Sequence, residues 1–172
     1  GSTMIVGIPR EIKPQENRVA LTPPGAHALA SAGHSVVLEA NAGINSGFPD
    51  EAYRAAGAAV VPTAEEVFSR AELIVKVKEP QPAETGLLQA RHLLFCYLHL
   101  AAEPALTQRL MESGCTAIAY ETVQAPDGSL PLLVPMSQVA GRMSVQVGAD
   151  VLLRHHGGRG VLLSGIPGVR PA

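Results

Sequence analysis

The stretch that decides the fold is Leu73 to Pro80, which reads LIVKVKEP. Its apolar start and the alternation that follows predict a strand buried on both faces, and the final Glu-Pro pair cannot continue a hydrogen-bonded ladder. Lys76 and Lys78 stand near the carboxyl end of this strand and point to the same side. Because ligands of open parallel sheets bind at the carboxyl ends of strands, Lys78 is a candidate for meeting an anion, with a solvated surface lysine as the alternative. Lys76 is interpreted as a structural or surface residue.

Strand patterns alternate with helix patterns on both sides of this stretch. Further strands are predicted at residues 5–8, 35–39, 59–61, 92–98 and 116–120. Helices are predicted after the N-cap candidates Thr22 and Thr63, and over Glu103 to Ser113. Strands that alternate with helices imply parallel strands joined by right-handed crossovers. The predicted class is therefore α/β, with a doubly wound, mainly parallel sheet of the flavodoxin or Rossmann kind.

The pattern changes after residue 120. A turn over Pro126 to Ser129 predicts a hairpin-like excursion. The longest helical stretch follows, from Pro135 to about His156, and ends at two glycines. Such a helix is long enough to lead from one domain into another.

Composition and charge exclude several classes of function. The net charge of −2, with no basic run, argues against a nucleic-acid surface, which needs clustered cations. No stretch of about 18 apolar residues predicts a membrane span. Cys96 and Cys115 lie in apolar runs, which indicates core positions and a cytoplasmic, reducing setting. The histidines show no metal-ligand spacing, so no metal site is expected.

Three polar residues follow the predicted ends of separate strands and point to one crevice. Arg18 follows the first strand, Lys78 closes the strand at 73–78, and His99 stands just after the strand at 92–98. Arg18 suits a carboxylate, Lys78 a carbonyl or imine oxygen or the same carboxylate, and His99 a proton near neutral pH. This set suits a 2-oxo or 2-amino acid. The alternatives are a surface ion pair for Arg18 and a satisfied core or edge histidine for His99.

The same residues lie within motifs of a known family. The chain from Met4 to its last residue resembles the amino-terminal half of NAD-dependent alanine dehydrogenases, in the runs VGIPREIKPQENRVALTP, KVKEP, LFCYLHLA, AIAYETVQ, LPLLVPMSQVAGRMSVQVGA and GGRGVLLSGIPGV. The resemblance implies reversible oxidative deamination of L-alanine to pyruvate and ammonia, with NAD as hydride acceptor. It also implies a homo-oligomer when the protein is full-length.

The resemblance assigns roles residue by residue. Arg18 in ENRVA and Lys78 in KVKEP are implied to bind substrate, and His99 in LHLA to transfer a proton. In PMSQVAG, Met136 is implied to lie near the substrate and Ser137 to contact the cofactor. A plain helix N-cap is the alternative for Ser137.

The chain departs from the family pattern near its end. A dinucleotide fold needs a strand, a G-x-G-x-x-G turn and a later acidic residue, and no such combination is recognisable. The expected organisation is an expression-tag remnant at 1–3, a substrate-binding domain at 4–133, and a linker helix with the start of a truncated NAD-binding domain at 134–172. This piece is not expected to act as a dehydrogenase by itself. The alternatives are a transhydrogenase alpha-subunit-like domain, a more distant saccharopine-type oxidoreductase, and a non-catalytic fragment for small-acid binding or assembly.

Overall fold

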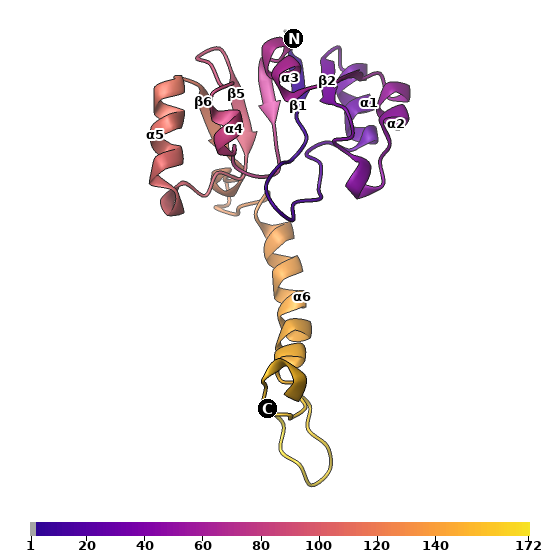
Figure 1. Ribbon diagram of the computed structural model, residues 1–172, viewed down its shortest axis with the longest axis vertical. Helices are drawn as coiled ribbons and strands as arrows, with labels where there is room; N and C mark the ends of the chain where they lie inside the picture. Colours follow the sequence, from indigo (N-terminus) through magenta and orange to yellow (C-terminus); the bar gives the residue numbers. More distant parts are fainter. Residues whose placement is uncertain (1–2) are drawn as a thin grey trace. The chain divides into compact units, whose positions relative to one another are not determined.

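The computed structural model describes residues 3–172, which form two compact units divided between Val123 and Gln124. The first unit contains a six-stranded sheet in the order β3-β2-β1-β4-β5-β6, and each neighbouring pair of strands is parallel (Figure 1). The strand order runs outward in opposite directions from β1 and β4, which is the doubly wound arrangement. The predicted α/β class is confirmed.

The described elements have the following bounds. The strands are β1 (Ile5–Ile8), β2 (Ser35–Glu39), β3 (Ala59–Val61), β4 (Leu73–Val75), β5 (Leu93–Cys96) and β6 (Thr116–Ala119). The α-helices are α1 (Pro23–Ser31), α2 (Asp50–Ala55), α3 (Ala64–Arg70), α4 (Pro82–Thr85), α5 (Pro104–Ser113) and α6 (Val134–Val151). The 3-10 helices are η1 (Ile44–Ser46), η2 (Leu100–Ala102), η3 (Tyr120–Thr122) and η4 (Arg154–His156).

Helices pack on both faces of the sheet. Val6 of β1 belongs to one core cluster with Ala26 of α1 and Tyr53 of α2. Val37 of β2 belongs to another cluster with Val67 of α3. Since successive residues of a strand face opposite sides, the two clusters lie on the two faces of the sheet. This double burial explains why the strands read as nearly continuous apolar runs.

Gly7, in the middle of β1, allows α3 to approach the sheet closely. A Cβ built at Gly7 would lie 2.6 Å from the Cβ of Ala71 and 2.8 Å from Cγ1 of Val67. Both distances are shorter than real carbon contacts allow. Glycine is required here by packing, since the backbone of Gly7 is ordinary extended strand.

Lys76, directly after β4, is fully buried together with two carboxylates. Its Nζ lies 3.1 Å from Oε2 of Glu11 and 2.9 Å from Oε1 of Glu84, and the three side chains are 0%, 2% and 3% exposed. Burial disfavours the ammonium, but attraction to Glu11 and Glu84 outweighs it and raises the pKa of Lys76. The lysine therefore joins the end of β4 to the loop after β1 and to α4. Of the two alternatives predicted for Lys76, the structural one is confirmed and the surface one is wrong.

Three predicted elements need correction. The strand predicted at 73–78 ends at Val75, and beyond it the backbone N–H groups of Val77 and Lys78 donate to the Glu11 carboxylate. The hairpin-like excursion contains turns and no strand within the described residues, and Ala125 N–H donates to the carbonyl of Ser129. The long helix stops at residue 151, and a separate 3-10 turn follows it.

The second unit, described by itself, consists of turns, α6, η4 and an irregular end. α6 contains no buried residue, and several of its apolar side chains are exposed, among them Val139, Val145 and Val147. No helix within residues 3–172 combines the length and the apolar character that crossing a membrane requires.

We expect Lys76→Met to lower the free energy of unfolding by about 3–5 kcal/mol, because it leaves two buried carboxylates without their cation. Urea denaturation of the 172-residue chain measures this. The control is Arg70→Met, which removes an exposed i,i+4 pair with Glu66 and should change stability by less than about 0.5 kcal/mol. Adding Glu11→Gln and Glu84→Gln to Lys76→Met should restore part of the loss. Equal unfolding midpoints for Lys76→Met and Arg70→Met would contradict the assignment.

We expect Gly7→Ala to cost about 1–3 kcal/mol, because the added methyl group overlaps Ala71 and Val67. The matched control is Gly86→Ala, where an added Cβ meets nothing within 4 Å and φ is −71°. Its effect should stay within about 0.5 kcal/mol. Thermal unfolding of the two variants tests this, and a Gly7→Ala chain as stable as the parent would show that α3 can shift freely.

Candidate functional site

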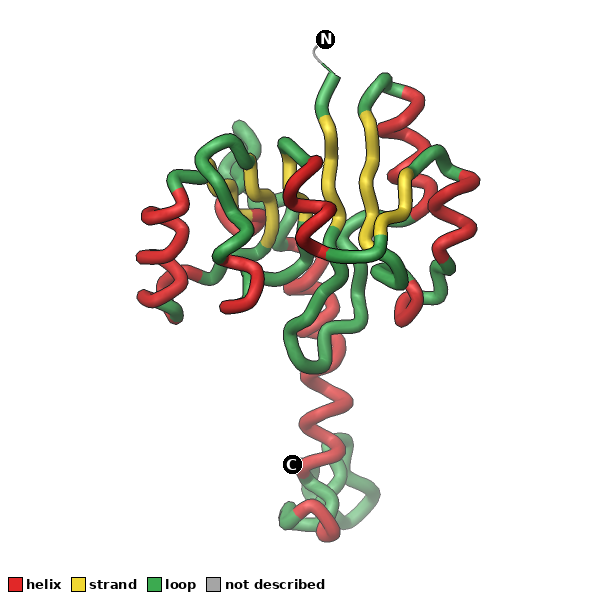
Figure 2. Tube along the Cα trace, turned by 45° about the horizontal axis from the view of Figure 1, so that its top comes forward, coloured by secondary structure: helices red, strands yellow, loops and turns green. Residues whose placement is uncertain are grey.

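The three predicted site residues of the first unit follow three adjacent strands. β1, β4 and β5 are neighbours in the sheet and run parallel. Arg18, Lys78 and His99 lie in the segments after their carboxyl ends, beside the point where the strand order reverses. Figure 2 shows the strands alongside one another and the long loop that follows β1 extending from their ends. Open α/β sheets bind ligands at this place, beyond the carboxyl ends of the strands where the strand order reverses.

Arg18 is held by a carboxylate two residues before it. Its Nε donates to Oε1 of Glu16 at 2.8 Å and its Nη2 to Oε2 at 2.6 Å, a bidentate pair. The Glu16 side chain is 8% exposed, whereas that of Arg18 is 44% exposed. The hydrogen bonds and the charge of Glu16 raise the pKa of Arg18. The guanidinium plane is therefore fixed while much of it still faces outward.

Lys78 is half-buried, and its charge acts on the same Glu16 carboxylate. The hydrogen bonds from Arg18 lower the pKa of Glu16, and the charge of Lys78 lowers it further as a smaller effect. The backbone N–H of Lys78 also donates to Oε2 of Glu11, at 3.4 Å. Arg18 is therefore paired with Glu16, and the backbone at Lys78 is held by Glu11. Arginine and lysine are side chains that can receive the carboxylate of a small acid.

His99 is exposed and begins η2 in a left-handed conformation, with φ 49° and ψ 40°. Its backbone N–H donates to Oε1 of Glu121 at 2.7 Å. A cavity of about 310 Å³ adjoins it, lined by Leu98, His99, Leu100, Ala101, Ala119, Glu121 and Thr122. Arg18 and Lys78 are not among these lining residues.

An aromatic cluster packs the segment before His99 against the residue that follows β6. The ring of Tyr97, two residues before His99, meets that of Tyr120 edge-on with centroids 4.9 Å apart, and Phe95 meets Tyr120 at 4.4 Å. Burial raises the pKa of Tyr120. Tyr97 also contributes, after Glu16, to the raised pKa of Arg18. The segment that leads to His99 is therefore packed against Tyr120, the residue that precedes Glu121.

Met136 and Ser137 lie in the first turn of α6, in the second unit. Met136 is half-buried and Ser137 is exposed, and the backbone N–H of Ser137 donates to the carbonyl of Leu133. The N-cap of α6 is Leu133, without a side-chain cap bond, so Ser137 is not the N-cap. Its hydroxyl can meet a ligand. The described part of 124–172 has no glycine turn between a strand and a helix, so this unit offers no complete dinucleotide cradle.

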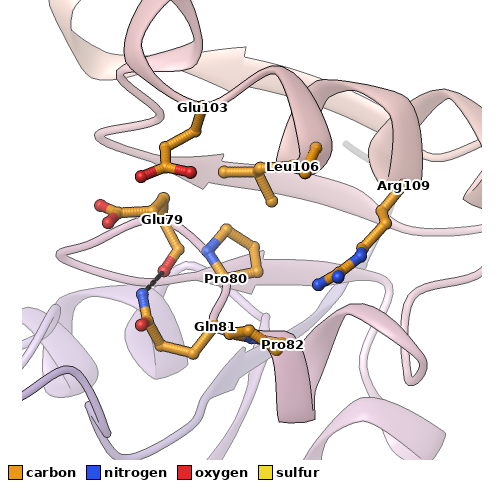
Figure 3. Close-up of a pocket in the computed structure, with 8 residues that line it drawn as sticks. Glu79, Pro80, Gln81, Pro82, Glu103, Leu106 and Arg109 are labelled. Atoms are coloured by element: carbon orange, nitrogen blue, oxygen red, sulfur yellow. Dashed lines mark hydrogen bonds between the residues drawn. The ribbon is translucent and has the colours of Figure 1, made fainter.

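A second cavity, of about 280 Å³, lies between α5 and the segment after β4 (Figure 3). It is lined by Glu79, Pro80, Gln81, Pro82, Glu103, Ala105, Leu106 and Arg109. None of the predicted site residues lines it. Within residues 3–172, no group of three His, Cys, Asp or Glu side chains is arranged to hold a metal ion.

Sequence reasoning missed the carboxylates that hold the site in place. Glu11 binds the segment after β4, Glu16 binds Arg18, and Glu121 binds the backbone at His99. Their spacing carries no periodic signal. Of the three, only Glu16 carries a local signal, because it stands two residues before Arg18.

Comparison with known proteins identifies the family of this chain. Residues 7–140 match the family model described as "Alanine dehydrogenase/PNT, N-terminal domain". Alanine dehydrogenases of Methanococcus maripaludis and Mycobacterium tuberculosis (strain CDC 1551 / Oshkosh) are each 56% identical to this chain over 169 residues, which is 98% of it and 45% and 46% of those proteins.

Comparison with solved structures also favours similarity to alanine dehydrogenases over similarity to transhydrogenases. A structure of an L-alanine dehydrogenase superposes with a TM-score of 0.87 at 58% identity, over 98% of this chain and 46% of that one. A transhydrogenase from Sinorhizobium meliloti gives a TM-score of 0.64 at 32% identity, over 68% of this chain and 35% of that one. The alanine dehydrogenase assignment is therefore the better supported of the two.

The chain spans less than half the length of the curated relatives named above. The family model nevertheless covers most of the chain, and the fold superposes closely on that of the L-alanine dehydrogenase structure. This chain belongs to the family of alanine dehydrogenase/PNT N-terminal domains.

Proposed function

We propose that the protein containing this chain reversibly deaminates L-alanine to pyruvate and ammonia with NAD, and that this chain supplies its substrate-binding part. The observation that carries the proposal is the guanidinium of Arg18, fixed by two hydrogen bonds to Glu16 yet partly exposed, in the segment after β1. The next strands in the sheet, β4 and β5, lead to Lys78 and His99. The identity to proteins named alanine dehydrogenase supports it.

Each residue has a role suited to a small 2-oxo acid. Arg18, with its plane fixed by Glu16, binds the substrate carboxylate through two parallel hydrogen bonds. Lys78 polarises the carbonyl or imine oxygen or pairs with the same carboxylate. His99 takes up and returns a proton at its imidazole. For Met136, the proposed role is contact with the substrate in the whole protein, which the similarity to alanine dehydrogenases supports.

When bound, NAD accepts the hydride and supplies the redox chemistry. Within this chain, Ser137 is the residue proposed to contact it. We further propose that 4–133 form the substrate domain, although the compact units divide earlier, after Val123. Residues 134–172 then form a linker helix and the first part of an NAD-binding domain. The chain alone is inactive, and the whole protein is a cytoplasmic homo-oligomer.

Arg18→Ala in the full-length protein should raise KM for pyruvate by about 10- to 100-fold, because charge-assisted hydrogen bonds contribute about 1.5–3 kcal/mol. Arg18→Lys should recover only part of the loss, since a lysine cannot form the bidentate pair. The control is Arg54→Ala, which removes an exposed pair with Glu51. Steady-state kinetics of pyruvate amination measure all three. An unchanged KM in Arg18→Ala would exclude this residue from the binding site.

His99→Asn should lower kcat by about 10²–10⁴-fold while KM for pyruvate changes little, because proton transfer contributes to the transition state. His27→Asn, at an exposed position on α1, is the matched control and should keep full turnover. If His99→Asn turns over at the parent rate, His99 is not the proton-transfer residue. The unmutated full-length protein distinguishes the transhydrogenase-like alternative. If it acts on nicotinamide substrates and not on alanine, that alternative is favoured.

A further inference from the structure

We propose that Glu121 is a positioning residue that fixes the backbone of His99 and thereby directs its imidazole. This inference rests on the proposed function, in which His99 transfers a proton. Glu121 itself acts through His99 and needs no contact with the substrate.

The first support is a set of hydrogen bonds to one carboxylate. Oε1 of Glu121 accepts from the backbone N–H of His99 at 2.7 Å and from that of Leu98 at 3.1 Å, and Oε2 lies 3.3 Å from the same Leu98 nitrogen. Bonds from N–H groups to an ionised carboxylate are stronger than bonds between neutral groups. The carboxylate therefore holds two consecutive peptide units at the end of β5.

The second support is the conformation that these bonds hold. His99 has φ 49° and ψ 40°, in the left-handed region that residues with a Cβ adopt uncommonly. Such conformations persist where surrounding contacts over-determine them, and they concentrate at functional sites. On its other side, the His99 carbonyl accepts from Ala102 N–H at 3.2 Å. The backbone is thus fixed at both ends, and the direction of the Cα–Cβ bond is set.

The third support is the rigidity of the element that carries Glu121. η3 follows β6, which pairs with β5, and Cys96 is in register with Ala119. Thr122 Oγ1 donates to the carbonyl of Ala119 at 3.1 Å, and the ring of Tyr120 packs edge-on against two aromatic side chains of the β5 segment. The carboxylate therefore reaches His99 from a neighbouring strand whose own position is fixed.

Glu121 and His99 also line the same cavity of about 310 Å³. Without the carboxylate, the left-handed residue would relax toward an ordinary conformation, and its imidazole would point elsewhere. A misplacement of about 1 Å in a reacting group can cost on the order of 10²-fold in rate. Substrate binding by Arg18 and Lys78 would remain, since both side chains belong to other segments.

The test compares four variants of the full-length protein in steady-state kinetics and thermal unfolding. Glu121→Ala should lower kcat by about tenfold or more, with KM for pyruvate within about threefold of the parent value. Glu121→Gln keeps an acceptor oxygen at the Oε1 position, so most of the turnover should be retained. Glu112→Ala is the matched control, because this carboxylate is exposed on α5 and accepts from Gln108. His99→Asn is measured in parallel.

Each outcome decides between the two claims. Parent-like kcat in Glu121→Ala, or equal losses in the Ala and Gln variants, overturns the positioning role. A fall in kcat together with a raised KM and a lowered Tm also overturns it, because that pattern describes general unfolding. If His99→Asn keeps its turnover, the proposed function of His99 fails. If His99→Asn loses turnover and Glu121→Ala does not, only the positioning role fails.

Discussion

The contact on which the site depends is the buried ion pair of Lys76 with Glu11 and Glu84. Burying one ammonium and two carboxylates is expensive, and the geometry must compensate with direct contacts. The same Glu11 carboxylate accepts the backbone N–H groups of Val77 and Lys78. It thereby holds the start of the segment that carries Lys78, the lysine proposed to bind substrate. One carboxylate therefore takes part both in the buried ion cluster and in fixing this segment.

Carboxylates also hold the other two segments of the proposed site through hydrogen bonds. Glu16 fixes the plane of Arg18 through two hydrogen bonds, and Glu121 fixes the backbone of His99. Each of these carboxylates lies beside the residue proposed to act and outside the chemistry itself. Loops have few internal hydrogen bonds of their own, so side-chain acceptors supply what a strand or helix would. The segments that carry Arg18 and His99 are consequently held by hydrogen bonds to carboxylates of this chain.

The candidate site was partly predictable from the sequence for a topological reason. Residues just after strand ends must meet at one edge of a parallel sheet, so Arg18, Lys78 and His99 could be grouped without coordinates. Lys76 could not be assigned, because alternation alone placed it on the same side as Lys78. Its burial depends on Glu11, which is 65 positions away along the chain. Contacts of that sequence separation leave no periodic signal.

The sequence by itself determined the local elements of this protein. Apolar runs specified the strands, and Thr22 and Thr63 marked helix starts where their hydroxyls do accept backbone N–H groups. These features depend on neighbours within a few residues. Only the tertiary structure decided where β4 stops, which lysine is buried and how His99 is held in a left-handed conformation. Those outcomes depend on carboxylates brought from distant segments, and their contact energies exist only once the sheet has formed.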